Sequence, residues 1–297
     1  MGREQRTPDG QLLNRSRLPA DVVGVIALVH IHKTAGTTLA GVFKRSFGGR
    51  HLDVLEIDRS TPHLTPDELR RIMDRFYPRL NSINAHPVRA YSGLEEVVPD
   101  IEYVSFLRNP IERTASHYQY DFQVGGVNIP FEEWVTHDSV PDRQTRILAG
   151  PNASGEDAIA LLPRFSFIGR SDAFDESLVL MRRKLAIPDI RYRSKWVAPS
   201  NDIKQRLLGD PESLELLASV NREDQKLWDH FAAEVYPKQV VGFGPGLDEA
   251  VTEFRQQNSK MNAFRVYGNR NYLAYVLKWR LRYRPWVRKV TGDPTAG

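Results

Sequence analysis

The fold of this chain is decided by residues 22–47, which read VVGVIALVHIHKTAGTTLAGVFKRSF. The stretch opens with a nearly continuous apolar run up to Val29, which is the pattern of a strand buried on both faces of a parallel sheet. A short polar turn follows, and the apolar side chains from Leu39 to Phe47 then recur at helical spacing. We therefore predict a strand, a turn and a helix in that order.

The same order recurs further along the chain. Residues 101–107 read as a strand, after which Asn109 offers a capping side chain and Pro110 a favoured first helical residue. Residues 165–168 read as another strand before an amphipathic segment, and residues 82–85 as a fourth. Strands that alternate with helices predict an α/β fold, with a P-loop-like central parallel sheet flanked by helices on both faces.

The chain divides into three expected parts. Residues 1–20 show no apolar periodicity and are predicted to be a flexible N-terminal lead. Residues 21–248 are predicted to form the α/β domain, in which residues 213–237 look helical. Residues 249–297 are predicted to form a C-terminal extension that carries a basic aromatic helix.

Composition excludes several kinds of chemistry. The 297 residues are 41% hydrophobic and 26% charged, as in ordinary globular proteins, and they include no cysteine. A disulfide framework, a thiolate nucleophile and a cysteine-ligated metal are therefore excluded. The longest apolar run near the start is far shorter than a membrane span needs, and the polar N-terminus lacks a secretory pattern. We expect a cytoplasmic location, with peripheral contact at a membrane surface left open.

The turn after the first strand has the chemistry of an anion site. Gly36 permits close backbone approach, the helix start presents N–H groups and a positive dipole end, and Lys33 adds a full charge. Thr37 and Thr38 add hydroxyl donors. The ordinary P-loop pattern GxxxxGK[ST] is absent, which weakens an ATPase interpretation. The structural alternative is a solvated lysine beside a turn glycine.

The second junction adds groups suited to a phosphate. Arg108 stands where the strand over 101–107 ends, and Ser116 follows two turns into the next helix. Parallel sheets place ligand sites at the carboxyl ends of their strands, so both junctions are expected at one edge. The helix also aligns Arg113, His117 and Tyr120 with Ser116 on one face. Arg108 pairing with its own helix, and a packed His117, remain alternatives.

These residues carry a family resemblance. HIHKTAGTTL (30–39) resembles the 5′-phosphosulfate loop, H-I-P-K-T-A-G-T-[ST], of sulfotransferases that use 3′-phosphoadenosine-5′-phosphosulfate (PAPS). SFLRNPIERTASHY (105–118) is similar to their 3′-phosphate motif, R-x-P-x-x-R-x-x-S-x-Y. RQTRILAG (143–150) and FIGRSDAFDESL (167–178) resemble segments of the carbohydrate branch, which includes uronyl and heparan sulfate 2-O-sulfotransferases. The resemblance spans roughly residues 25–180.

The resemblance implies a donor and its ligands. PAPS is the implied sulfuryl donor, with no metal, and a carbohydrate or glycoconjugate is the implied acceptor. Arg108 and Ser116 are implied to hold the 3′-phosphate. His32 stands where the family usually has Pro, a departure that changes loop stiffness rather than the chemistry of Lys33. The residues implied to hold the 5′ end are Lys33, Thr34, Ala35, Gly36, Thr37 and Thr38.

Sulfuryl transfer needs a base and a cation. Lys33 is the expected cation, because a fixed positive charge stabilises the leaving oxygen electrostatically. We expect His86 to be the general base, because imidazole titrates near neutral pH and the residue follows the strand predicted over 82–85. The related enzymes also place a histidine after the corresponding strand. The competing candidates are His30, His32, Glu95 and Glu96, whereas His51, His63, His137 and His230 lack motif support.

The positive charge of the chain lies in its tail. Residues 264–297 hold eight Lys and Arg against one acid, a net charge of +7, so residues 1–263 carry −3 of the overall +4. On a helix, the tail presents one stripe of leucines and another of aromatic residues. Three interpretations stay open for residues 264–290: packing on the body, contact with an anionic membrane surface, or contact with an anionic glycan. No nucleic-acid partner is expected.

The sequence therefore predicts a PAPS-dependent carbohydrate sulfotransferase with His86 and Lys33 as its catalytic pair. A P-loop-type nucleotide-dependent phosphotransferase is the enzymatic alternative. The nonenzymatic alternative is a protein that binds anionic polymers through the basic tail.

Overall fold

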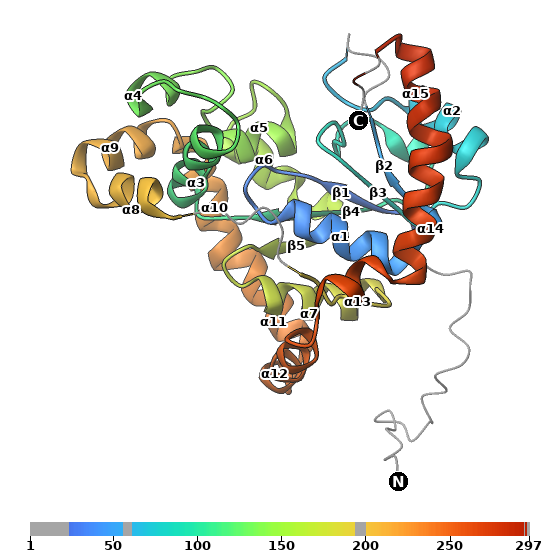
Figure 1. Cartoon of the computed structure of the whole chain (residues 1–297). Coiled ribbons are helices and arrows are strands. Elements are labelled where there is room, and N and C mark those ends of the chain that lie inside the picture. Colours follow the sequence, from blue (N-terminus) through green and yellow to red (C-terminus); the bar gives the residue numbers. More distant parts are fainter. Residues whose placement is uncertain (1–23, 56–60, 194–199, 294, 296–297) are drawn as a thin grey trace.

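The computed structural model describes residues 24–55, 61–193, 200–293 and 295. The predicted lead over residues 1–20 lies outside the described residues. A five-stranded sheet in the order β2-β3-β1-β4-β5 forms the centre of the molecule, and every neighbouring pair is parallel (Figure 1). The strands are β1 (Ile26–Val29), β2 (His51–Asp53), β3 (Ser82–Ala85), β4 (Glu102–Leu107) and β5 (Phe165–Arg170).

Helices connect and cover these strands. From β1 the chain crosses to β2 at the edge of the sheet, and from β2 it returns in the opposite direction to β3. Because crossovers between parallel strands are right-handed, these opposite directions place α1 and α2 on opposite faces of the sheet. The predicted parallel α/β sheet with flanking helices is confirmed. The α-helices are α1 (Gly36–Phe47), α2 (Pro66–Phe76), α3 (Pro110–Gln123), α4 (Phe131–Trp134), α5 (Arg143–Ala149), α6 (Gly155–Leu161), α7 (Phe174–Leu185), α8 (Asp202–Gly209), α9 (Pro211–Ser219), α10 (Arg222–His230), α11 (Tyr236–Phe243), α12 (Leu247–Asn258), α13 (Ala263–Tyr267), α14 (Arg270–Lys278) and α15 (Arg284–Thr291). Shorter 3-10 turns are η1 (Gly48–Arg50), η2 (Leu94–Glu96) and η3 (Leu162–Arg164), and the π-helical segments are η4 (Phe231–Val235) and η5 (Trp279–Tyr283).

The junctions read from the sequence form as expected. All four residues of β1 are buried, as the continuous apolar run predicts. The Asn109 side chain accepts the Glu112 N–H at 3.2 Å and Pro110 is the first residue of α3, so this helix begins at the predicted cap.

Three details differ from the prediction. The first strand begins at Ile26, whereas the apolar run starts at Val22, and Val22 and Val23 lie outside the described residues. The short strand β2 was not anticipated, since three residues carry no readable pattern. The helical stretch over 213–237 is interrupted at Asn221, whose side chain donates to the Leu217 carbonyl and thereby competes with the backbone ladder.

The C-terminal segments pack on the same body. Helix α12 contributes Val251 and Phe254, and the last helices contribute Tyr283 and Val287, to one core cluster with the strands. The expected boundary between residues 248 and 249 falls at the start of α12, and the division itself stays a prediction. Figure 1 shows α14 and α15 as one long helical rod beside β2, at the edge of the sheet.

Candidate active site

The loop between β1 and α1 is sharply bent. Lys33 and Ala35 both have φ of 66°, in the left-handed region that residues with a Cβ adopt only when the surroundings hold them there. Ala35 precedes the first turn of α1, which no side chain caps. The positive end of the helix dipole and its first N–H groups therefore remain suited to an anion at this position.

Packing requires a glycine at position 36. A Cβ at Gly36 would lie 2.0 Å from Cδ2 of His30, so any side chain would displace that ring. The buried Thr34 hydroxyl donates a hydrogen bond to the Ile31 carbonyl at 3.0 Å and thereby stabilises the loop. Thr38 is also buried, whereas Thr37 is exposed at the helix start.

The two predicted motifs meet in space. Arg108, at the end of β4, donates from Nη1 to the Lys33 carbonyl at 3.3 Å, although the two residues are far apart in the chain. Lys33 places its ammonium 4.1 Å from the centre of the Tyr120 ring on α3. Burial, and then the charge of Arg108, lower the pKa of Lys33. An anion bound between Lys33 and Arg108 would oppose both effects, because a nearby negative charge favours the protonated amine.

A partner of Arg108 was missed in the sequence. The buried side chain of Gln144 on α5 accepts from the Arg108 N–H and donates to its carbonyl, both at 3.0 Å. This pair of bonds fixes the backbone where β4 ends. The only signal in the sequence was the RQTRILAG stretch, which resembles a segment of the carbohydrate sulfotransferases but does not predict this contact.

The 3′-phosphate candidates lie on α3 with an acidic neighbour. Ser116 is half-buried, two turns into the helix. Arg108 pairs with Glu112 at 3.3 Å, and Glu112 also pairs with Lys204 of α8 at 2.9 Å. The anticipated pairing of Arg108 with its own helix is therefore present, alongside its contact with the loop that contains Lys33.

Three histidines form a stacked column at the carboxyl ends of β1 and β3. The His86 ring stacks on His32 with centroids 4.0 Å apart and an 8° angle between planes, and on His30 at 4.3 Å. His86 is exposed and directs Nδ1 at the His30 carbonyl at 3.3 Å. Since a carbonyl only accepts, Nδ1 carries the proton, and Nε2 becomes the atom that accepts one.

Neighbouring histidines are held neutral. Burial, reinforced by His86, lowers the pKa of His30 to about 3. Burial also lowers the pKa of His32, with His86 and Arg143 adding to the effect. Arg143 donates to Nδ1 of His32 at 3.4 Å, so that nitrogen is an acceptor. These two rings are thus supports for the exposed ring rather than proton carriers at neutral pH.

The remaining candidate bases lie in other settings. Glu95 pairs with Arg164, which precedes β5 and therefore marks the amino end of the sheet, opposite the histidine column. His51 is fully buried between Ser82 and Asp53, at 2.8 and 3.1 Å. His117 packs edge-on to Trp134, and burial followed by Arg113 lowers its pKa to about 3. The packed alternative for His117 is the one that the structure supports.

Arg113 extends this basic region into the interior. Its side chain is fully buried, with Nη2 donating to the Thr114 hydroxyl at 2.8 Å, while Nε and Nη1 have no hydrogen-bond partner. Burial lowers its pKa to about 10, although the charge of Asp224 opposes the shift. Among the described residues, no group of three or more His, Asp or Glu is arranged to hold a metal ion.

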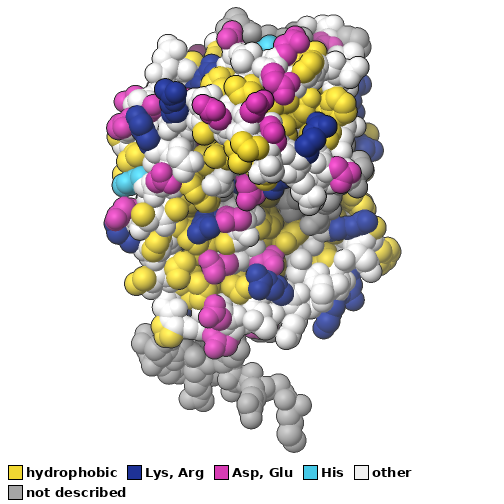
Figure 2. Space-filling model, turned by 90° about the vertical axis from the view of Figure 1, so that its left-hand side faces the viewer, with side chains coloured by type: hydrophobic (Ala, Val, Ile, Leu, Met, Phe, Trp, Pro, Cys, Tyr) yellow, Lys and Arg dark blue, Asp and Glu magenta, His cyan; other side chains and the backbone are white. Residues whose placement is uncertain are grey.

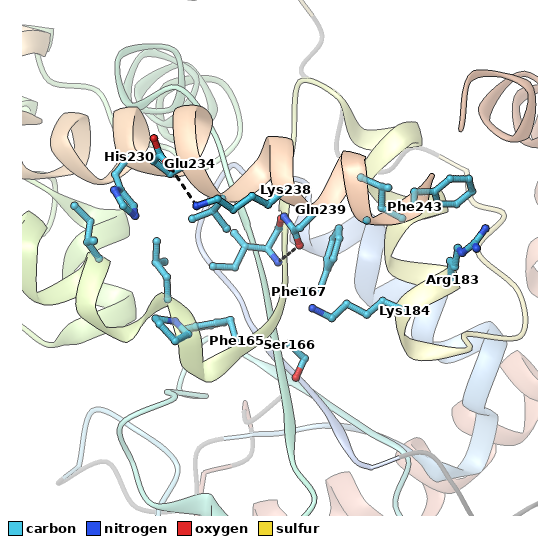
Figure 3. A pocket seen from close by; sticks show the side chains of 17 residues that line it. Phe165, Ser166, Phe167, Arg183, Lys184, His230, Glu234, Lys238, Gln239 and Phe243 are labelled. Carbon is cyan, nitrogen blue, oxygen red and sulfur yellow. Dashed lines mark hydrogen bonds and ion pairs between the residues drawn. The ribbon is translucent and has the colours of Figure 1, made fainter. Parts of the chain in front are cut away.

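A large cavity lies elsewhere. A cavity of about 640 Å³ follows the outer edge of β5, between α7 and α11 (Figure 3). Its walls are largely apolar, and Gln239 reaches across to β5, donating to the Ile168 carbonyl at 2.8 Å. None of the residues at the loop, the histidine column or α3 lines it. The site residues predicted from the sequence therefore lie at the strand ends and not in this cavity.

Comparison with known proteins tests the resemblance read from the sequence. The chain is 26% identical to galactose-3-O-sulfotransferase 3 of Mus musculus over 305 residues, which cover 88% of this chain and 68% of that protein. The resemblance to the carbohydrate sulfotransferases is confirmed. No family model matches the chain. This relative supports the prediction that the chain is a sulfotransferase enzyme.

A solved structure is also similar. The sulfotransferase from Alicyclobacillus acidocaldarius matches with a TM-score of 0.38 and 14% identity, covering 70% of this chain and all of that one. At that score the match carries no inference, and the fold rests on the strand order and register described above.

The expected cytoplasmic location is wrong. The mouse sulfotransferase is of Golgi type and not cytoplasmic. The expectation had rested on the short apolar run near the start and on the polar N-terminus, and neither feature fixes a compartment. In the part of the chain that the structure describes, no helix combines the length and apolar character required to span a bilayer.

Proposed function

We propose that the protein transfers a sulfuryl group from PAPS to a hydroxyl of a galactose-bearing carbohydrate. The observation that carries the proposal is the meeting of the two motifs, with Arg108 bonded to the loop that contains Lys33. The galactose acceptor is inferred from the name of the mouse relative. When bound, PAPS supplies an activated sulfuryl group whose bond to the 5′-phosphate breaks as the acceptor oxygen bonds to sulfur.

The loop and α3 fit such a donor. The uncapped start of α1, Lys33 and the exposed Thr37 suit the 5′ end, with Gly36 keeping the loop close-packed against His30. Arg108 and Ser116 suit the 3′-phosphate, which distinguishes PAPS from ATP. Half-buried cations that repel each other, such as Lys33 and Arg108, suit a site for an anion of high charge.

His86 and Lys33 divide the chemistry between them. His86 takes the proton of the acceptor hydroxyl at Nε2, because Nδ1 is committed to the His30 carbonyl. Lys33 stabilises the negative charge that develops on the leaving oxygen, and its partly desolvated setting strengthens that interaction. His30 and His32 hold the His86 ring by stacking and stay neutral beside it.

The donor assignment is tested by calorimetric binding of 3′-phosphoadenosine 5′-phosphate (PAP) against ATP, without magnesium. We expect the intact protein to prefer PAP, and Arg108→Ala to lose that preference because its planar guanidinium no longer meets the 3′-phosphate. Arg164→Ala is the matched control, since Arg164 pairs with Glu95 at the opposite end of the sheet. Equal affinity for PAP and ATP in the intact protein would reject the donor.

The acceptor is tested separately by release of PAP from PAPS in the presence of saccharides. Turnover with a saccharide that ends in galactose, and its loss when the galactose is replaced by glucose, is the expected result. Turnover that ignores the sugar would contradict the acceptor while leaving the donor assignment intact.

A further inference from the structure

The C-terminal helix rod, α14 to α15, docks on the body through its aromatic stripe. Tyr275 donates to Asp53 at 2.5 Å, Trp279 donates from Nε1 to the Asp53 carbonyl at 3.2 Å, and the Tyr283 hydroxyl accepts the Leu55 N–H at 3.1 Å. Tyr283 and Val287 are fully buried. Packing on the body, one of three interpretations left open by the sequence, is therefore correct for this stripe.

The leucine stripe faces away from the body. Leu273, Leu277 and Leu281 are 48%, 58% and 70% exposed, and their spacing of four residues puts them on one side of the rod. The described residues include nine large hydrophobic side chains that are exposed, and six of these lie within 264–290. Exposed apolar side chains are therefore concentrated in this segment rather than scattered singly over the surface.

The charges around these leucines all have one sign. Arg270, Arg280, Arg282 and Lys289 are exposed on the rod, and residues 264–292 contain no Asp or Glu. The face of the molecule drawn in Figure 2 differs, because acidic and basic side chains are mixed across it. A helix that combines exposed leucines with exposed cations has the composition of an interfacial amphipathic helix.

We infer that the outer face of residues 270–290 binds anionic lipid surfaces, with the leucines entering the acyl boundary and the cations meeting the headgroups. Cations alone would fit any polyanion, including a sulfated glycan. The leucines decide for lipid, because a glycan offers no apolar phase in which to bury them. This inference is independent of the proposed sulfuryl transfer.

The test is cosedimentation of the full-length protein with vesicles of phosphatidylcholine, with and without phosphatidylserine. Wild type is expected to sediment with the anionic vesicles only. The double variant L277S/L281S keeps every charge but is expected to lower the partition coefficient roughly tenfold or more, because it removes apolar area that would enter the lipid. R270Q/R280Q is expected to weaken binding as well, and added salt to weaken it further.

Two controls keep the outcome interpretable. V241S changes an exposed valine on α11, outside the rod, and is expected to bind vesicles as wild type does. PAP binding and turnover with soluble acceptors are expected to be unchanged in all three variants, since none alters a residue placed at the active site.

Three results would overturn the inference. One is equal binding to neutral and anionic vesicles or to neither. Another is binding to anionic vesicles that L277S/L281S leaves intact but soluble heparin abolishes, which would indicate a polyanion site instead. The last is a dimer in solution that L277S/L281S dissociates, which would make the stripe a contact between two copies of the chain.

Discussion

The surroundings of the loop between β1 and α1 and the C-terminal helix rod are both rich in Lys and Arg, but they differ in how deeply these charges are buried. Around the loop, Lys33 and Arg108 are half-buried and Arg113 is fully buried, and after burial itself the charge of Arg108 helps to lower the pKa values of Lys33 and Arg113. On the rod, the cations are exposed and stand among leucines. Converging buried charges select one compact anion, whereas charges spread along an exposed helix select an extended surface.

The largest effect is expected at the base. His86→Asn removes the Nε2 acceptor and should lower kcat roughly 10²–10⁴-fold, the usual contribution of a positioned general base. PAP affinity should stay as in wild type, because His86 is not among the donor ligands. Steady-state kinetics measures kcat and calorimetry measures PAP affinity, with His137→Asn, at an exposed histidine, as the control. Full activity in His86→Asn would show that another residue is the general base.

A smaller loss is expected at Lys33. Lys33→Ala removes the cation nearest the leaving oxygen and should cost roughly 10²–10³-fold in kcat, as for the loss of one preorganised electrostatic donor. Lys289→Ala on the rod removes the same charge from an exposed position and should leave kcat unchanged. Similar losses in the two variants would mean that overall basicity, rather than the buried geometry, drives the reaction.

Within the rod, the two stripes should differ in stability. Tyr283→Phe leaves the Leu55 N–H without its buried acceptor and should lower the free energy of unfolding by about 1–3 kcal/mol. Leu281→Ala, on the exposed stripe, should change it by less than about 0.5 kcal/mol. Urea denaturation of both variants measures the difference. Equal effects would contradict the assignment of an inner and an outer face.

The histidine column should make stability depend on pH. His30 has a folded-state pKa of about 3, so below about pH 6.5 the unfolded chain binds a proton that the folded protein does not. Stability therefore falls as pH drops through this window, by at most about 1.4 kcal/mol per pH unit for this histidine. His30→Phe should flatten the dependence measured by urea denaturation, and His137→Phe should not. An unchanged slope in His30→Phe would show that the ring is protonated inside the fold.

Local patterns explain most of what the sequence predicted. The strand–turn–helix units around Lys33 and Arg108 rest on short-range features: an apolar run, a cap and a first-turn proline. Strand β2 was missed because three residues form a strand only through pairing with β3. Gln144 was missed for a related reason, since a single amide acquires its role from the distant backbone it bonds.

The sequence by itself determined the parallel sheet and the cationic, glycine-containing turn at its strand ends, because apolar runs, caps and a lysine beside a glycine turn act within a few residues. It also determined that the tail would be a helix with an aromatic stripe and a leucine stripe. Only the tertiary structure decided which stripe is buried, and which histidine presents an accepting nitrogen. Periodicity fixes the faces of a helix, but the surface on which the helix docks decides which face meets water.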